Sequence, residues 1–165
     1  MATLCDFQIR HLARTKGLVE PYDDRQLNPA SYDVTLGSHI KIETPQGWQD
    51  VDISIPGFEL APGAFILAVT EEVVRVPASL EAVFQLKSSR GREGYNHLLA
   101  GYIDPGFTGK VTLELQNVNK YTWLPIQAGM RIGQLRFMKM DQMPGRPYYL
   151  TGRYNNDMDV QASRG

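Results

Sequence analysis

Apolar and polar residues alternate in short stretches along most of this chain, the pattern of half-buried β-strands. Glycine and proline separate these stretches at the even spacing typical of an all-β sandwich or barrel. We expect strands at Tyr32–Leu36, His39–Glu43, Gln49–Ile55, Ala64–Val69, Ala82–Lys87, Leu98–Ile103, Lys110–Asn117, Tyr121–Leu124 and Arg131–Met138. The sequence therefore predicts a mainly β fold.

Helical periodicity is confined to the start of the chain. Asp6 is a candidate N-cap, and Gly17 is a candidate C-terminal stop. Between them, Ile9, Leu12 and Ala13 recur at helical spacing and would form one apolar stripe. We therefore expect one short N-terminal helix in front of the strands.

The length and composition of the chain describe one globular domain. Its 165 residues are 42% apolar and 21% charged, which is ordinary for a soluble protein with its own core. We found no internal repeat, linker or low-complexity tract, so residues 1–165 are expected to form a single domain. Residues 140–165 are polar and lack periodicity, which is typical of a frayed C-terminal tail.

Charge and targeting signals exclude several classes of protein. A net charge of −1 gives no reason to expect binding to nucleic acid. Cys5 is the only cysteine, which rules out an internal disulfide and fits a reducing compartment. No apolar run approaches the ~18 residues of a membrane helix, and the polar N-terminus is unlike a signal peptide. We expect a cytoplasmic protein with no membrane partner.

Two carboxylates stand close together in the sequence after residue 100. Asp104 opens an Asp-Pro-Gly run, which is strong turn chemistry. In the strand that follows, Leu113 and Leu115 alternate with Glu114, so this carboxylate should face away from the apolar layer. An isolated strand glutamate is more often a solvated surface residue. Its neighbours favour a functional site.

A basic, hydroxyl-rich segment lies just upstream, at Lys87–Arg92. Hydroxyls, backbone N–H groups and guanidinium forks are the groups that bind a phosphate chain. It is not a P-loop, because the only Gly-Lys pair, Gly109-Lys110, is followed by valine. Alone, the segment is more typical of a solvated basic loop. Together with Asp104 and Glu114 it indicates a nucleotide site.

The order of these motifs resembles the dCTP deaminase family of the trimeric dUTPase-like superfamily. The resemblance covers nearly the whole chain and is most specific in its central block. The matching segments are Ser88–Arg92, His97–Phe107 and Thr112–Leu115 in the centre, Gln26–Gly37 and Ala128–Phe137 towards the ends and, more loosely, the tail Pro147–Arg164.

The resemblance implies a distorted jelly-roll or β-barrel of the dUTPase-like type. It also implies a homotrimer with active sites shared between subunits, and hydrolytic deamination of dCTP to dUTP. The tail at 140–165 would close over the bound triphosphate. Bifunctional members of the family continue to dUMP, and Gly101-Tyr102 is more like their Gly-aromatic pair.

Two other functions stay open at this stage. A dUTPase without deaminase activity would call for a glycine-rich C-terminal arm, which is absent, and would lack Glu114 in this role. A non-catalytic jelly-roll module that binds a nucleotide or a protein partner is compatible with the fold alone. The presence of Ser88, Arg92, Asp104 and Glu114 together argues against it.

The sequence does not support a zinc site. Zinc deaminases carry H-x-E and P-C-x-x-C signatures, whereas this chain has one cysteine and three scattered histidines, His11, His39 and His97. We interpret these histidines as structural or surface residues. Zinc-independent deamination needs a protein base to activate water, and Glu114 matches the family's catalytic glutamate.

The resemblance also assigns supporting roles. Ser88 and the backbone of Ala100 would hold water and ammonia, and Arg92 would anchor the charge around Glu114. Asp104 would accept a hydrogen bond from the 3′-hydroxyl, and the backbone of Thr112 and Leu113 would read the pyrimidine edge. The triphosphate would bind Mg²⁺ through its phosphates, with no protein metal ligand. The catalytic set is Glu114, Ser88, Arg92 and Ala100; the substrate-binding set is Lys87, Ser88, Ser89, Arg90, Gly91, Arg92, Asp104, Thr112, Leu113, Glu114, Tyr148 and Arg153.

Several positions depart from the family pattern. Leu99 replaces a usual threonine, and Arg153 replaces a usual lysine. Asp157 falls where a glutamine would touch the triphosphate; because an aspartate is a poor phosphate neighbour, we leave it out of the binding set. Tyr148 could equally be a tail aromatic that packs on the barrel.

Overall fold

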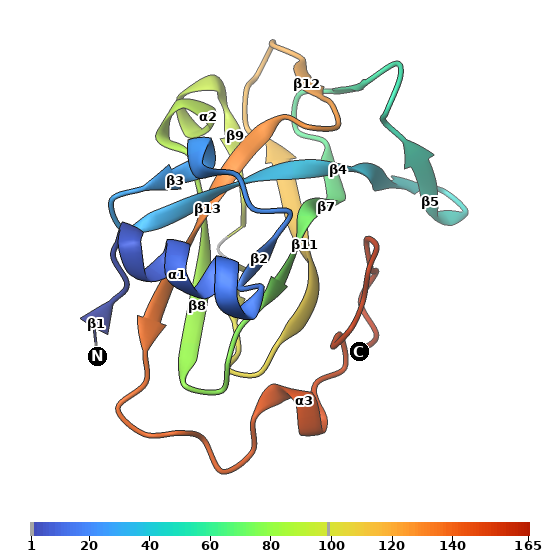
Figure 1. Cartoon of the computed structure of the whole chain (residues 1–165). Coiled ribbons are helices and arrows are strands. Elements are labelled where there is room, and N and C mark those ends of the chain that lie inside the picture. The colour runs from blue at the N-terminus through green and yellow to red at the C-terminus, as the bar shows by residue number, and fades with distance from the viewer. Residues whose placement is uncertain (1, 99) are drawn as a thin grey trace.

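The computed structural model describes residues 2–98 and 100–165, and β-strands dominate it (Figure 1). The expectation for Leu99 lies outside the described residues. The helices are α1 (Asp6–Lys16), a 3₁₀ turn η1 (Asp24–Gln26), α2 (Ser88–Glu93) and α3 (Tyr148–Thr151). The strands are β1 (Ala2–Thr3), β2 (Val19–Glu20), β3 (Leu27–Asn28), β4 (Ser31–Thr44), β5 (Gly47–Asp52), β6 (Phe58–Leu60), β7 (Phe65–Arg75), β8 (Leu80–Leu86), β9 (Tyr95–Asn96), β10 (Tyr102–Ile103), β11 (Thr108–Asn117), β12 (Leu124–Ile126) and β13 (Arg131–Lys139).

A curled sheet of eleven strands organises the molecule, with strand order β10-β8-β13-β4-β7-β11-β9 along its main path, and β6 and β12 pair in a separate two-stranded sheet. The long strand β4 joins its two parts: its first half pairs with β13, and its second half pairs with β7 and β5. The sheet encloses the main hydrophobic core, in which Tyr32, Leu113 and Phe137 are fully buried. The prediction of a mainly β fold with a short N-terminal helix is confirmed.

Helix α1 starts one residue earlier than the candidate cap suggests. Its N-cap is Cys5, whose backbone N–H donates to the side chain of Gln8 at 3.1 Å, while Asp6 lies in the first turn. A carboxylate in the first turn still stabilises the helix, because it lies near the positive end of the helix dipole. Gly17 ends the helix in the left-handed region at φ 63°, as predicted.

Three other local predictions were wrong. Only Tyr102–Ile103 of the expected strand Leu98–Ile103 is extended, because Leu98 adopts a positive φ of 33° and lies in a turn. The expected strand Tyr121–Leu124 lies instead at Leu124–Ile126. The basic segment after Lys87 is not a loop: Ser88–Glu93 forms helix α2, which ends at Gly94 in the left-handed region.

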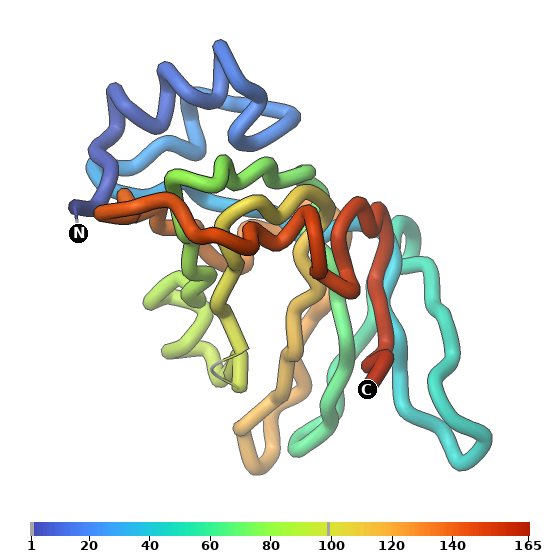
Figure 2. The backbone as a smooth tube through the Cα atoms, turned by 90° about the horizontal axis from the view of Figure 1, so that it is seen from below, coloured from blue at the N-terminus to red at the C-terminus, as the bar shows by residue number. Residues whose placement is uncertain are grey.

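The C-terminal tail packs against the sheet, in contrast to the frayed terminus its composition suggests. Figure 2 shows it running beside β11. The Asp157 carbonyl accepts from Lys110 N–H at 2.8 Å, and the Gln161 N–H donates to the Thr112 hydroxyl at 3.1 Å. Val160 is buried in a small second cluster on the outer face of β7. These contacts hold the tail in place over the strand that carries Glu114.

None of the described helices is long and apolar enough to cross a membrane.

Candidate active site

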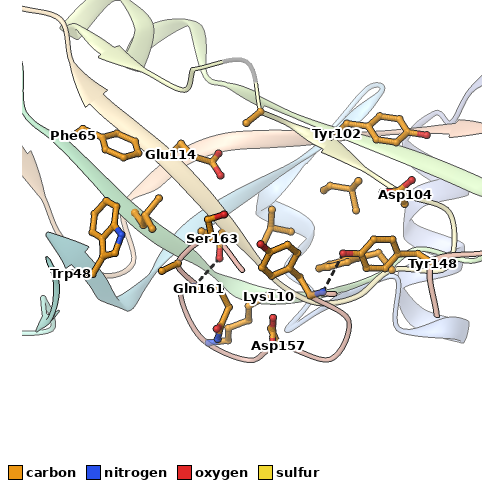
Figure 3. Close-up of a pocket in the computed structure, with 18 residues that line it drawn as sticks. Trp48, Phe65, Tyr102, Asp104, Lys110, Glu114, Tyr148, Asp157, Gln161 and Ser163 are labelled. Atoms are coloured by element: carbon orange, nitrogen blue, oxygen red, sulfur yellow. Dashed lines mark hydrogen bonds between the residues drawn. The ribbon is translucent and has the colours of Figure 1, made fainter. Parts of the chain in front are cut away.

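A pocket of about 460 Å³ lies between the outer face of β7 and β11 and the C-terminal tail (Figure 3). Five of the residues expected at the site line it: Ala100, Asp104, Thr112, Glu114 and Tyr148. In Figure 3, Glu114 lies between an aromatic end at Trp48 and Phe65 and an opposite end at Asp104 and Tyr148. The pocket therefore brings together residues from the middle and the end of the chain.

Glu114 faces the pocket because of strand periodicity. Its neighbours Leu113 and Leu115 are fully buried in the core, so the intervening side chain points to the opposite face. Burial raises the pKa of the Glu114 carboxyl above its ordinary value, since desolvation disfavours the charged form. One carboxylate oxygen is buried without a hydrogen-bond partner. This carboxyl is suited to take up and release a proton.

His97 lies beside that carboxyl, which sequence reasoning missed. Its Nε2 is 3.5 Å from Oε2 of Glu114, and both atoms are buried without a hydrogen-bond partner. The imidazole packs edge-on against Phe84, with ring centroids 4.4 Å apart. Burial lowers the pKa of His97 to about 4, so the ring is neutral near pH 7. It therefore brings no positive charge to Glu114.

Asp104 occupies a tight turn at the other end of the pocket. Burial raises the pKa of its carboxyl above the ordinary value. Gly106 in the same turn has a φ of 92°, and a Cβ there would lie 2.9 Å from the ring of Tyr149. The turn is thus pressed against the start of the tail, and Tyr148 N–H donates to the Pro105 carbonyl at 2.8 Å.

Tyr148 both packs and lines the pocket. Its ring lies 5.8 Å from that of the buried Phe107, and its hydroxyl accepts from Tyr154 N–H at 3.2 Å. Arg153 is exposed and is not among the lining residues. The side chain of Leu113 is in the core, so only its backbone can meet a ligand.

None of the residues Lys87–Arg92 lines the pocket. Lys87 instead forms an ion pair with the buried Asp33. Arg90 pairs with Glu93 at 2.7 Å and donates to the carbonyl of Arg131. The remaining expected residues of the segment are all exposed on α2: Ser88, Ser89, Gly91 and Arg92.

The electrostatics of the pocket are acidic. Asp104, Glu114 and Asp157 all line it, and Lys110 is the only lysine or arginine among the described lining residues. Lys110 is itself paired with Glu71 at 3.3 Å. Acidic groups therefore outnumber basic groups in the described lining of the pocket.

Strand register brings in further residues that no motif marks. On β7, Leu67 pairs with Glu114 and Phe65 pairs with Gln116. On the hairpin of β4 and β5, Trp48 pairs with Glu43, and its ring lies 5.9 Å from that of Phe65. In the sequence, only the alternation of apolar and polar residues along these strands indicates that these side chains share one face of the sheet.

The described residues contain no group of three or more histidine, cysteine, aspartate or glutamate side chains that could hold a metal ion.

Sequence comparisons identify clear relatives. The sequence model of the dCTP deaminase-like family matches residues 3–140. A protein of Dictyoglomus thermophilum named "dCTP deaminase, dUMP-forming" is 37% identical over 175 residues, covering 94% of this chain and 90% of the relative. A protein of Persephonella marina with the same name is 37% identical over 176 residues, covering 98% and 96%.

Solved structures support the fold. The crystal structure of 2′-deoxycytidine 5′-triphosphate deaminase from Agrobacterium tumefaciens superposes with a TM-score of 0.70 at 24% identity, covering 84% of this chain and 48% of that chain. A dUTPase from Staphylococcus aureus phage phi11 gives a TM-score of 0.53 at 14% identity, covering 77% and 87%. The expected dUTPase-like jelly-roll type is confirmed.

Proposed function

This chain belongs to the dCTP deaminase-like family, and from that premise we propose that it hydrolyses dCTP to dUTP and ammonia with Glu114 as the general base. Membership covers most of the chain, so the protein is an enzyme of this family rather than a non-catalytic jelly-roll module. The observation that carries the mechanism is the half-buried carboxyl of Glu114, which faces the pocket and has a raised pKa.

In the proposed reaction, Glu114 takes a proton from water as the water oxygen bonds to C4 of the pyrimidine. The carboxyl then gives that proton to ring N3, and the tetrahedral intermediate breaks its bond to the exocyclic nitrogen. That nitrogen leaves as ammonia with a proton from the added hydroxyl. A raised pKa supports this role because a base works best with a pKa near the working pH.

We assign the deoxyribose to the opposite end of the pocket. The Asp104 carboxylate would accept a hydrogen bond from the 3′-hydroxyl. The support is its place on the pocket wall and the tight packing of its turn against the tail. The backbone of Thr112 and Leu113 would meet the base edge, since Leu113 has no side chain on that face.

We propose that a second copy of the chain completes the site within a homotrimer. Ser88, Ser89 and Arg92 are exposed on α2 and do not line the pocket of their own chain. The pocket is acidic, whereas α2 and Lys87 supply cations and hydroxyls. Insertion of α2 from a neighbouring subunit would bring Ser88 and Arg92 to the water beside Glu114, and Ser89 and Arg90 to the phosphates.

We propose that the metal used here is magnesium and not zinc. Mg²⁺ prefers oxygen ligands, and Asp157 on the pocket wall has a buried carboxylate oxygen without a partner. Bound to the triphosphate, Mg²⁺ would neutralise phosphate charge. Zinc favours cysteine and histidine, yet Cys5 caps α1, and among the described residues only His97 lies beside a pocket carboxylate. We propose a zinc-independent enzyme.

We propose further that the chain continues to dUMP. In that step water attacks the α-phosphorus of dUTP, and diphosphate leaves as the phosphoanhydride bond breaks. Relatives with this product in their names align over nearly the whole chain. Tyr102, of the Gly-aromatic pair, lines the pocket close to Asp104.

Product analysis tests the proposal directly. Purified protein is incubated with dCTP and Mg²⁺, and the nucleotides are separated. Ammonia with dUMP and diphosphate supports the bifunctional reaction, and ammonia with dUTP alone limits the enzyme to deamination. Hydrolysis of supplied dUTP without any deamination of dCTP would show a dUTPase instead. Activity that survives a zinc-selective chelator, with Mg²⁺ restored, supports a zinc-free mechanism.

A further inference from the structure

We propose that Asp33 is a positioning residue for the deaminase reaction, because it fixes the start of helix α2. This inference rests on the proposed function, in which α2 brings Ser88 and Arg92 to the pocket of a neighbouring subunit. Asp33 belongs to the family-like segment Gln26–Gly37, yet none of the described pocket-lining residues comes from that segment. Its side chain pairs with the residue that starts α2 instead.

Asp33 is a charged residue inside the molecule. It lies on β4 between Tyr32 and Val34, which are fully buried in the core, so its side chain points to the opposite face of the strand. That face is covered as well, and only 3% of the Asp33 side chain is exposed. A buried carboxylate is costly unless it is paired and hydrogen-bonded, so the partners of Asp33 show what it holds.

The partners of Asp33 connect it to α2. Lys87, the N-cap residue of α2, forms an ion pair with its Oδ2. Asn28 donates to its Oδ1 at 2.8 Å, and a guanidinium nitrogen of Arg131 lies 3.9 Å from Oδ2. The carbonyl of Arg131 in turn accepts from Arg90 of α2 at 2.9 Å. Asp33 therefore holds the first residue of α2 and lies beside a second residue that binds this helix.

Helix α2 depends on such contacts, because it has no buried residue of its own. At its C-terminal end, the side chain of Asn119 donates to the Glu93 carbonyl at 2.7 Å. The ion pair with the buried aspartate is the anchor at its start. Ser88 and Arg92 are four positions apart and so lie on one face of the helix. A small shift of α2 would move both side chains, and a misplacement of about 1 Å can lower a rate by about 10²-fold.

The alternative is that Asp33 serves only the stability of the fold. In some proteins a buried ion pair specifies one packing of the chain without any role in the site. The two roles predict different results in trimers that mix two variants. A residue that acts through α2 impairs only the sites that receive this helix. A residue needed by the whole fold impairs every site to which its chain contributes.

The experiment measures ammonia release from dCTP by mixed trimers of full-length chains, co-expressed with two affinity tags. Asp33→Asn removes the charge but keeps the size of the side chain, and trimers of this variant alone should deaminate at least tenfold more slowly than the parent. Mixed with Glu114→Gln, it should restore about a quarter of the sites, where an intact α2 meets an intact Glu114. Mixed with Arg92→Ala, it should restore none, because every α2 is then impaired.

Two further variants separate this role from misfolding. Glu72→Gln changes a carboxylate that is as buried as Asp33 but bonds Gln26 and Thr35, neither of which belongs to α2. It should lower the melting temperature and retain the parent kcat. Asn28→Ala removes one neutral partner of Asp33 and is the milder variant if Asp33→Asn does not assemble. It should lose activity severalfold alone and recover with the same partner.

The mixture of Arg92→Ala with Glu114→Gln is the reference, because it tests the shared site without Asp33. When that mixture recovers, three results overturn this inference alone: parent-like activity of Asp33→Asn, its recovery with Arg92→Ala, or no recovery with either partner. When the reference mixture does not recover, the shared site is wrong and this inference falls with it. A parent chain that releases no ammonia from dCTP overturns the proposed function as well.

Discussion

The pocket around Glu114 and helix α2 are two polar regions of opposite character in one chain. The pocket collects the carboxylates of Asp104, Glu114 and Asp157, whereas α2 and the residue before it carry Lys87, Arg90 and Arg92. The carboxylates lie against a sheet face and the tail; the α2 cations lie outside the pocket. A nucleoside triphosphate needs both kinds of group. The proposed trimer would bring the two regions together as the two halves of one site.

The two regions also differ in how the fold makes them. Glu114 depends on pairing of β11 with β7 and on the buried residues beneath it. Helix α2 is a six-residue element with no buried residue, and it ends at Gly94. Long-range packing therefore sets the environment of the pocket carboxyls. Helix α2, by contrast, is exposed and is shaped mainly by its local geometry.

The largest expected effect comes from the pocket. Glu114→Gln keeps the shape of the side chain but removes the base, so deamination should fall by about 10²–10⁴-fold while dCTP binding persists. Ammonia release and calorimetry measure the two quantities. Glu43→Gln, on the exposed part of the same sheet, is the matched control and should leave both ammonia release and dCTP binding unchanged. Residual activity above about a hundredth of the original would contradict the assignment.

The next effect tests whether the two regions meet in one site. The Arg92→Ala and Glu114→Gln variants should each be nearly inactive alone. Trimers that contain chains of both variants should recover activity. If each site takes Glu114 from one subunit and Arg92 from the next, random equal mixing restores about a quarter of the sites. Co-expression with two affinity tags yields the mixed species. No recovery in verified mixed trimers, or a monomer in sedimentation, would contradict a site shared between subunits.

A smaller effect concerns the neighbour of Glu114. The folded-state pKa of His97, about 4, lies below the ordinary 6.5 of histidine. The group therefore contributes stability that is present above pH 6.5 and is lost as pH falls towards 4. The loss is at most about 3 kcal/mol. Chemical unfolding across this range should show a shallower decline for His97→Gln than for the parent chain. His11→Gln, exposed on α1, should follow the parent.

The smallest effect is a trade-off between stability and function in the pocket. The pKa of Glu114 is raised on folding, so its contribution is present below its ordinary pKa and is lost as pH rises through the folded value. Glu114→Gln should therefore melt at a higher temperature than the parent at pH 8, with the gap closing near pH 4. Calorimetric melting curves at both pH values measure it. A gap of the same size at both would mean that packing, not ionisation, is responsible.

The sequence by itself determined the elements whose signals are local. Alternation placed Leu113 and Leu115 in the core and turned Glu114 to the other face, as observed. The Asp-Pro-Gly turn at Asp104 and the helix stop at Gly17 follow from backbone preferences of single residues, and both stand in the structure. Motif order was enough to reveal the family.

Local pattern was misleading where short-range signals are weak. The segment Ser88–Glu93 contains a glycine and adjacent hydroxyls, which favour a loop, yet it forms a helix of six residues. The tail is polar, so its composition predicts fraying. Hydrogen bonds of its backbone to Thr108, Lys110 and Thr112 hold it against β11, and composition does not encode such bonds.

Only the tertiary structure decided which side chains meet. Pairing of β9 with β11 carries the following residue, His97, to the side of Glu114, although seventeen positions separate them. Register between β4, β5 and β7 brings Trp48 to the same pocket, and the tail adds Asp157. Periodicity is a property of neighbouring residues, whereas register and docking are fixed by the burial of the whole core. The sequence therefore determined which side chains of each strand point to the same face, and the packed fold decided which residues those side chains contact.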